Sequence, residues 1–97
     1  MGYKLEYSKQ AKKDAKLLER ARLDRKAKEL LGIIKRNPFE PPCEKLFRDM
    51  NGCYSRRINK QHRIVYEILP NTEALKDADG ELYKGIAHIL RMWTHYE

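Results

Sequence analysis

Long hydrophobic runs are absent from this sequence, which nowhere stays apolar over the roughly 20 residues that a membrane-spanning helix needs. The first residues also lack the apolar segment and cleavage site of a secretory signal. Met1-Gly2 does not match the N-myristoylation pattern, because position 6 is Glu6 rather than serine or threonine. We therefore expect a cytoplasmic protein with no membrane partner.

Metal-binding patterns are equally scarce. The two cysteines, Cys43 and Cys53, form no CxxC pair and have no histidine at the spacing of a zinc site. The acidic turn at 77–80, Asp-Ala-Asp-Gly, lacks the third ligand position that precedes the glycine of a calcium loop. We expect reduced thiols, no metal and no cofactor. A disulfide would need a geometry that the sequence cannot supply.

Charge, in contrast, is plentiful and unevenly spread. The 97 residues include 21 Lys and Arg against 14 Asp and Glu, a net charge of +7. Basic residues are concentrated in 1–36 and between Lys45 and Arg63, whereas acidic ones dominate after Glu67. A chain of this length forms one domain, residues 1–97. Its basic regions indicate a polyanionic partner, most simply nucleic acid, although the helices alone also fit an ordinary solvated surface.

The first half of the chain has the pattern of one strand and two helices. Residues 3–7 alternate apolar and polar, as a half-buried strand does, and Ser8 is a good N-cap. A helical apolar stripe follows and changes phase between Arg20 and Asp24, which favours two antiparallel helices joined by a tight turn. A single long helix stays open because no Gly or Pro marks the break. The stripe residues are Ala11, Ala15, Leu18, Leu23, Ala27, Leu30, Leu31 and Ile34.

The second half is predicted to form strands. Asn37-Pro38 ends the helical region, and 38–43 is a stiff, proline-rich connector. Residues 54–58 and 62–66 form a β-hairpin, the polar arm 69–84 is a hairpin excursion, and 86–93 is a last strand. The fold class is therefore α+β in the order β-α-α-β-β-β, with two N-terminal helices packed on a mostly antiparallel four-stranded sheet.

The predicted hairpin places two arginines opposite each other. A three-residue turn at 59–61 sets Ile58 against His62 and Arg57 against Arg63. Like charges destabilise such a pair unless the face holds an anion, and the planar guanidinium suits a phosphate. The apolar set Tyr54, Ile58, Ile64, Tyr66 and Ile68 shares the other face and should meet the helices.

Several motifs together resemble a known family. They are Asn-Pro-Phe-Glu at 37–40, Glu44, Asn-Gly-Cys-Tyr-Ser-Arg-Arg-Ile at 51–58, Gln-His-Arg-Ile-Val-Tyr at 61–66, and His95-Tyr96. The sequence resembles the YoeB/Txe branch of the RelE superfamily, the toxins of type II toxin–antitoxin pairs, whose members have a RelE-like microbial ribonuclease fold. The resemblance covers the whole chain apart from the arm at 70–85.

The resemblance implies a ribosome-dependent mRNA endoribonuclease, an mRNA interferase that cuts translated message at the decoding site without a metal. Glu44 matches the general base that activates the 2′-hydroxyl, His95 the general acid, and Arg63 the residue that stabilises the phosphate. Tyr96 matches the aromatic residue beside the scissile bond, and Arg57 a second phosphate-facing arginine. Two features depart from the family: Glu97 follows the tyrosine, and the arm is longer.

Each of these residues also has a simpler interpretation. Glu44 by itself reads as a solvated loop acid, and Arg57 and Arg63 fit plain binding of an RNA backbone. Three further RNA-binding candidates surround them: Lys45, Ser55 and Arg56. Arg56 falls among the apolar set by parity, so we expect it to snorkel at the sheet edge or to reach the ligand from the strand end.

The partners that the resemblance implies are the ribosome, mRNA and a cognate acidic antitoxin of the YefM/Axe kind, whose tail covers or distorts the site. A homodimer also agrees with the family, although the residues themselves give no sign of one. Two alternatives remain on the same scaffold: a non-catalytic RNA-binding module, and a gyrase inhibitor resembling the ParE toxins. Neither alternative needs the Glu, Arg and His set.

Overall fold

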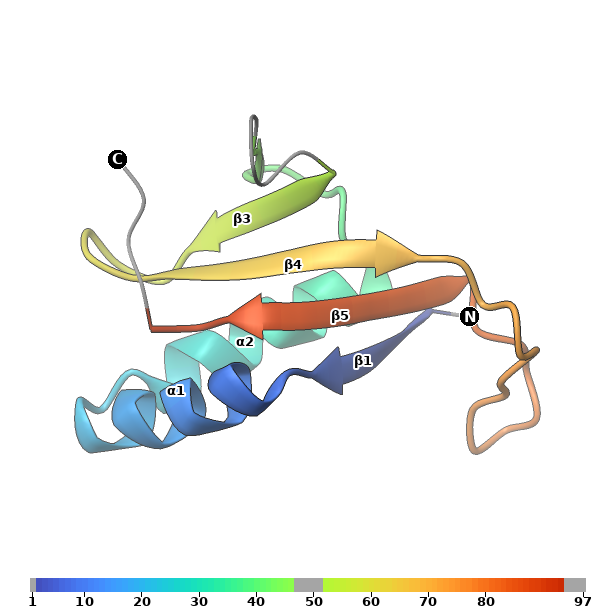
Figure 1. Ribbon diagram of the computed structural model, residues 1–97, viewed down its shortest axis with the longest axis horizontal. Coiled ribbons are helices and arrows are strands. Elements are labelled where there is room, and N and C mark those ends of the chain that lie inside the picture. The colour runs from blue at the N-terminus through green and yellow to red at the C-terminus, as the bar shows by residue number, and fades with distance from the viewer. Residues whose placement is uncertain (1, 47–51, 94–97) are drawn as a thin grey trace.

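The computed structural model describes residues 2–46 and 52–93. Two helices lie on one face of a five-stranded sheet (Figure 1). The elements are β1 (Tyr3–Tyr7), α1 (Lys9–Arg20), α2 (Asp24–Arg36), β2 (Glu44–Lys45), β3 (Cys53–Arg57), β4 (Arg63–Leu69) and β5 (Gly85–Arg91). None of the helices described is long and apolar enough to span a bilayer.

The sheet confirms the predicted α+β class and corrects the number of strands. Its order is β1-β5-β4-β3-β2, with β1 parallel to β5 and all other pairs antiparallel. The additional strand is β2, which pairs Glu44 with Ser55 and Lys45 with Tyr54. Two residues are too few to leave an alternating pattern in the sequence, so the four-strand prediction missed this strand.

The helix break lies at the predicted place and has a defined cause. Arg22 adopts a left-handed conformation with φ 61°, and its N–H bonds the Glu19 carbonyl at 3.1 Å. The Leu23 N–H bonds the Leu18 carbonyl at 2.8 Å, which completes a Schellman motif. Glycine usually occupies the left-handed position, and an arginine there explains why no breaker marks the turn.

The core forms between the helices and the near face of the sheet. The predicted stripes supply Ala11, Leu18, Ala27 and Ile34, all of which are buried. They pack against Ile58, Ile64, Tyr66, Ala87, Ile89 and Met92 from the strands and the turns that follow them. The hairpin register is also confirmed, since Arg57 pairs with Arg63 and the Ile58 N–H bonds the His62 carbonyl.

The arm at 70–84 folds back on itself, as predicted, at the end of the sheet opposite the β3–β4 turn (Figure 1). The side chain of Asn71 bonds both sides of this arm. The side-chain amide donates to the carbonyls of Leu75 and Tyr83, each at 3.0 Å, and accepts the Leu75 N–H at 2.9 Å. A bridge between Lys76 and Leu82 closes the loop.

Tyr66→Phe tests the link between the core and the connector. Tyr66 is fully buried, and its hydroxyl donates to the Pro38 carbonyl at 2.6 Å. Burial raises the pKa of Tyr66 to about 12, so the donor stays protonated. Losing this bond should lower the free energy of unfolding by about 1 to 2 kcal/mol in chemical denaturation. Tyr7→Phe, at an exposed ring, is the control, and an equal loss in both would contradict the assignment.

Candidate active site

An acid and an arginine are in direct contact on the sheet face that the helices leave open. Nη1 of Arg63 donates to Oε2 of Glu44 at 2.7 Å and to Oγ of Ser55 at 3.2 Å. The Glu44 side chain is 62% exposed, whereas that of Arg63 is 13% exposed. The carboxylate is thus accessible to a ligand while the guanidinium is held in place.

Strand register explains how these groups meet. Glu44 on β2 pairs with Ser55 on β3, and Ser55 pairs with Val65 on β4. Because paired residues point to the same face, Glu44 and Ser55 share a face with Arg63, two residues before Val65. Arg57 stands opposite Arg63 and is exposed. Four of the predicted site residues are therefore gathered at one end of this face.

The electrostatics of the cluster favour an ionised acid. The hydrogen bond from Arg63 and its positive charge, with a smaller contribution from Arg57, hold the pKa of Glu44 below its usual range. Glu44 therefore carries its charge at neutral pH and can accept a proton from a nearby hydroxyl. The same carboxylate relieves the repulsion between the two facing guanidiniums.

Arg56 does not join this cluster, which corrects the expectation that it contacts RNA. It is 2% exposed on the opposite face, and its guanidinium donates to the carbonyls of Pro42 at 3.1 Å, Asn37 at 3.5 Å and Glu40. All three carbonyls belong to the bend that leads from α2 to β2. Arg56 therefore braces the connector, because irregular backbone buried without donors is costly.

Lys45 lies on the other face, Ser55 is a buried member of the cluster, and two predicted residues are not described. Lys45 pairs with Tyr54, so strand alternation places it on the face opposite Glu44, where it is exposed. His95 and Tyr96 lie outside the described residues. Ser55 is 1% exposed and orients Arg63, which makes it a support for the guanidinium and not a surface contact.

Two histidines have partners that the sequence did not reveal. Nδ1 of His88 lies 3.5 Å from a carboxylate oxygen of Glu67, directly across the β4–β5 ladder on the open face. The ring of His62 stacks on Trp93, with centroids 3.8 Å apart. Pairing of β4 with β5 creates the first contact, so only a correct register between distant segments would have found it.

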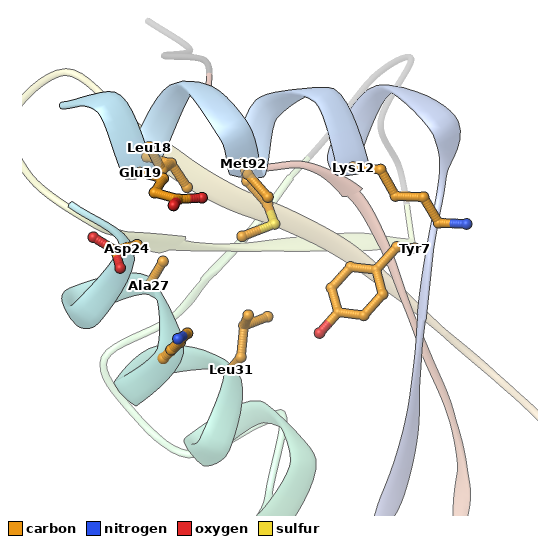
Figure 2. A pocket seen from close by; sticks show the side chains of 10 residues that line it. Tyr7, Lys12, Leu18, Glu19, Asp24, Ala27, Leu31 and Met92 are labelled. Atoms are coloured by element: carbon orange, nitrogen blue, oxygen red, sulfur yellow. The ribbon is translucent and has the colours of Figure 1, made fainter. Parts of the chain in front are cut away.

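Two of the clefts in the described structure differ in their relation to this cluster. One, of about 400 Å³, runs between α1 and α2 on the helical side, with Leu18, Leu31 and Met92 in its apolar lining (Figure 2). The other, of about 500 Å³, lies between α2 and the proline connector and includes Glu44 and Arg57 in its wall. Only the second is continuous with the cluster. Within 2–46 and 52–93, no group of three or more His, Cys, Asp or Glu is arranged to hold a metal ion.

Comparison with known proteins fits this arrangement. The model of the YoeB-like toxin of bacterial type II toxin-antitoxin systems matches residues 6–83. The chain belongs to this family. A YoeB toxin from Synechocystis sp. is 42% identical over 57 residues, which cover 57% of the present chain and 59% of the relative. The match thus spans less than two thirds of that relative's length.

Solved structures of YoeB toxins extend the similarity to nearly the whole chain. The YoeB/ParE toxin from Agrobacterium tumefaciens is 28% identical, with a TM-score of 0.74 over 96% of this chain and 99% of that one. A YoeB dimer from Staphylococcus aureus is 29% identical, with a TM-score of 0.70 over 97% and 98%. A YoeB–YefM complex from the same organism is 30% identical, with a TM-score of 0.67 over 97% and 98%.

A titration of Glu44 tests the electrostatics of this YoeB-like site. Carboxyl ¹³C NMR should give a pKa below the usual glutamate range, because Arg63 stabilises the ionised form. Arg63→Gln should bring the value back toward the ordinary one of about 4.3, and Arg57→Gln should raise it less. An unchanged value in Arg63→Gln would show that the ion pair does not form in solution.

Arg56→Lys and Arg57→Lys form a matched pair that separates bracing from surface contact. An ammonium cannot reach three diverging carbonyls as a guanidinium does, so Arg56→Lys should cost about 1 to 3 kcal/mol of unfolding free energy. Arg57→Lys, at an exposed position, should stay within about 0.5 kcal/mol of the parent. Equal midpoints in urea would argue against the bracing role.

Proposed function

We propose that this toxin is a ribosome-dependent endoribonuclease that cleaves translated mRNA at the decoding site, with side chains supplying the acid, the base and the cations. The observation that carries the proposal is the 2.7 Å contact between Glu44 and Arg63 on the open face of the sheet. It puts an exposed group able to take a proton beside a group able to bind phosphate.

The reaction is a transfer within the RNA. Glu44 takes the proton of the 2′-hydroxyl, whose oxygen attacks the adjacent phosphorus. Arg63 and Arg57 neutralise the charge that develops on the non-bridging oxygens. His95 gives a proton to the departing 5′-oxygen, since a histidine holds a proton near neutrality when it lies beside phosphate. The products are a 2′,3′-cyclic phosphate and a free 5′-hydroxyl.

The ion pair also suits the resting enzyme. Before RNA binds, Glu44 and Arg63 compensate each other, and Ser55 keeps the guanidinium oriented. An RNA phosphate bound to Arg63 competes with Glu44 for the N–H groups of the guanidinium. Glu44 is then free to turn toward the ribose. Arg57 is a second cation that faces Arg63 across the ladder. A phosphate bound between the two guanidiniums would reduce their mutual repulsion.

The placement of Trp93 supports a role for the residues that follow it. Trp93 is the last residue described, and its ring stacks on His62, the residue before Arg63. The described chain therefore ends at a point next to the start of β4. We assign the acid role to His95, and we assign stacking against a base to Tyr96.

The proposed partner is an acidic antitoxin. Relatives from Staphylococcus aureus are described as a YoeB–YefM complex and as a YoeB dimer. The net charge of +7 and the exposed Arg57 offer a surface for an acidic segment that folds on binding. We propose that this segment covers Glu44 and Arg63, and that a homodimer is a second assembly of the chain.

Glu44→Gln is the central test. The amide keeps the size of the side chain but cannot take a proton, so cleavage should fall by about 10² to 10⁴-fold while binding to ribosomes is kept. The measurement is mapping of message ends in a translation extract that receives purified toxin. Glu29→Gln, an exposed acid on α2, is the control and should cut like the parent.

The outcomes separate the competing functions. Cuts that appear only on translated message and vanish in Glu44→Gln and His95→Ala support the nuclease with both residues in their roles. Translation that stops with the message intact would replace cleavage with RNA binding alone. Cutting by Glu44→Gln at the parent rate would remove Glu44 from the mechanism.

A further inference from the structure

Helix α1 holds the carboxyl-terminal end of β5 through a series of hydrogen bonds. At the start of the helix, Ser8 donates its N–H to the Ile89 carbonyl at 2.9 Å and its Oγ–H to the Leu90 carbonyl at 2.8 Å. The same Oγ accepts the Ala11 N–H and caps the helix. The N-cap of α1 is thus also a clamp on the last strand.

Asp14 continues this clamp beyond the strand. Its Oδ2 accepts Nε–H of Arg91 and the N–H of Met92, both at 2.9 Å, while Oδ1 accepts from Gln10 at 3.1 Å. Nη2 of Arg91 in turn donates to the Trp93 carbonyl at 3.2 Å. Each residue from Ile89 to Trp93 is therefore tied to α1 or to a residue that α1 holds.

A buried carboxylate is an unusual choice for this position. Asp14 is 0% exposed and lies between Ala11 and Leu18 on the apolar stripe of α1. Burial alone would raise its pKa, but hydrogen bonds from Arg91, Met92, Gln10 and Trp93 outweigh that effect and lower it. Apolar residues often replace a buried ion pair without loss of stability, so packing alone does not require an acid here.

The pairing of β5 with β4 is irregular at the carboxyl-terminal end of β5. The β4–β5 ladder changes register between Val65 and Tyr66, opposite the segment from Ile89 to Arg91. Helix α1 supplies the contacts that fix the strand after this irregularity. Met92 then turns into the space between α1 and α2, beside Leu18 and Leu31 (Figure 2).

We propose that Asp14 is a positioning residue for the cleavage reaction, which fixes Arg91, Met92 and Trp93 so that the chain leaves β5 at one defined point on its way to His95. This inference rests on the proposed function, because it depends on the acid role of His95. Asp14 touches neither Glu44 nor Arg63, which lie on the other side of the sheet. It acts only through the end of the strand.

Chain geometry makes this anchor effective. His95 is the second residue after Trp93 in the sequence, so the chain between them spans at most about 7 Å. Because the connection is this short, fixing Trp93 limits the region that residue 95 can reach. A misplacement of about 1 Å at a reacting group can cost about 10²-fold in rate. The bonds from α1 to the end of β5 thus bear on the proposed acid only through this short connection.

A double-mutant cycle between Asp14 and His95 tests the proposal. Asp14→Asn, which keeps the size but weakens the bonds to Arg91 and Met92, should lower single-turnover cleavage on ribosomes by about tenfold or more, with unchanged ribosome affinity. In the His95→Ala background the same change should have no further effect. Losses that multiply, or a rate equal to the parent, would overturn the proposal.

Gln10→Ala is the matched control, because it removes a bond to the same carboxylate without touching β5. It should leave cleavage near the parent rate. Urea unfolding of Asp14→Asn should confirm a folded protein under assay conditions. If the cleavage loss follows the unfolded fraction, Asp14 is only structural and the proposal fails.

A spectroscopic measurement keeps the proposal separate from the proposed function. Trp93 is the only tryptophan in the chain, and its ring stacks on His62. Asp14→Asn should shift its emission and increase quenching by acrylamide, whereas Gln10→Ala should not. If the parent toxin cuts no message, the nuclease fails while this result stands. If Trp93 is unperturbed in folded Asp14→Asn, the anchoring fails even though the nuclease stands.

Discussion

The register of the β3–β4 hairpin is the constraint on which the rest of the molecule depends. A turn of three residues sets Arg57 against Arg63, and strand alternation then sends Ser55 and Arg63 to the open face and Ile64 to the core. A slip of one residue would exchange every one of these positions. The fold and the candidate site are thus fixed by the same ladder of hydrogen bonds.

Neighbouring arginines on β3 show how one strand serves two purposes. Arg57 is exposed beside the ion pair, whereas Arg56 points inward and collects carbonyls from the bend at 37–42. That bend leads directly into β2. Glu44 on β2 lies on the same face as Arg63 and accepts its hydrogen bond. The interior arginine supports the position of the exterior acid without being near it.

Sequence patterns predicted the parts of the structure that depend on the spacing of apolar and polar residues. The apolar stripes, the Ser8 cap and the hairpin register all follow from spacing, and each is present. The contact between Glu44 and Arg63 depends on a two-residue strand with no period, so only the family resemblance nominated Glu44. Nothing in the sequence distinguishes the buried Arg56 from the exposed Arg57 beside it. The sequence analysis did not identify Asp14, because its partners Arg91 and Met92 lie 77 and 78 positions away.

The place of β5 in the sheet has a consequence for how the protein forms. This strand is the last of the strands described, yet it lies between β1 and β4 and joins them. During synthesis β1 therefore lacks its described sheet partner until Gly85 and the residues after it have been made, and the helices lack their contacts with Ala87, Ile89 and Met92 until then. Such long-range closure is slow and cooperative. Closure of the sheet therefore waits for residues 85–91, which join β1 to β4.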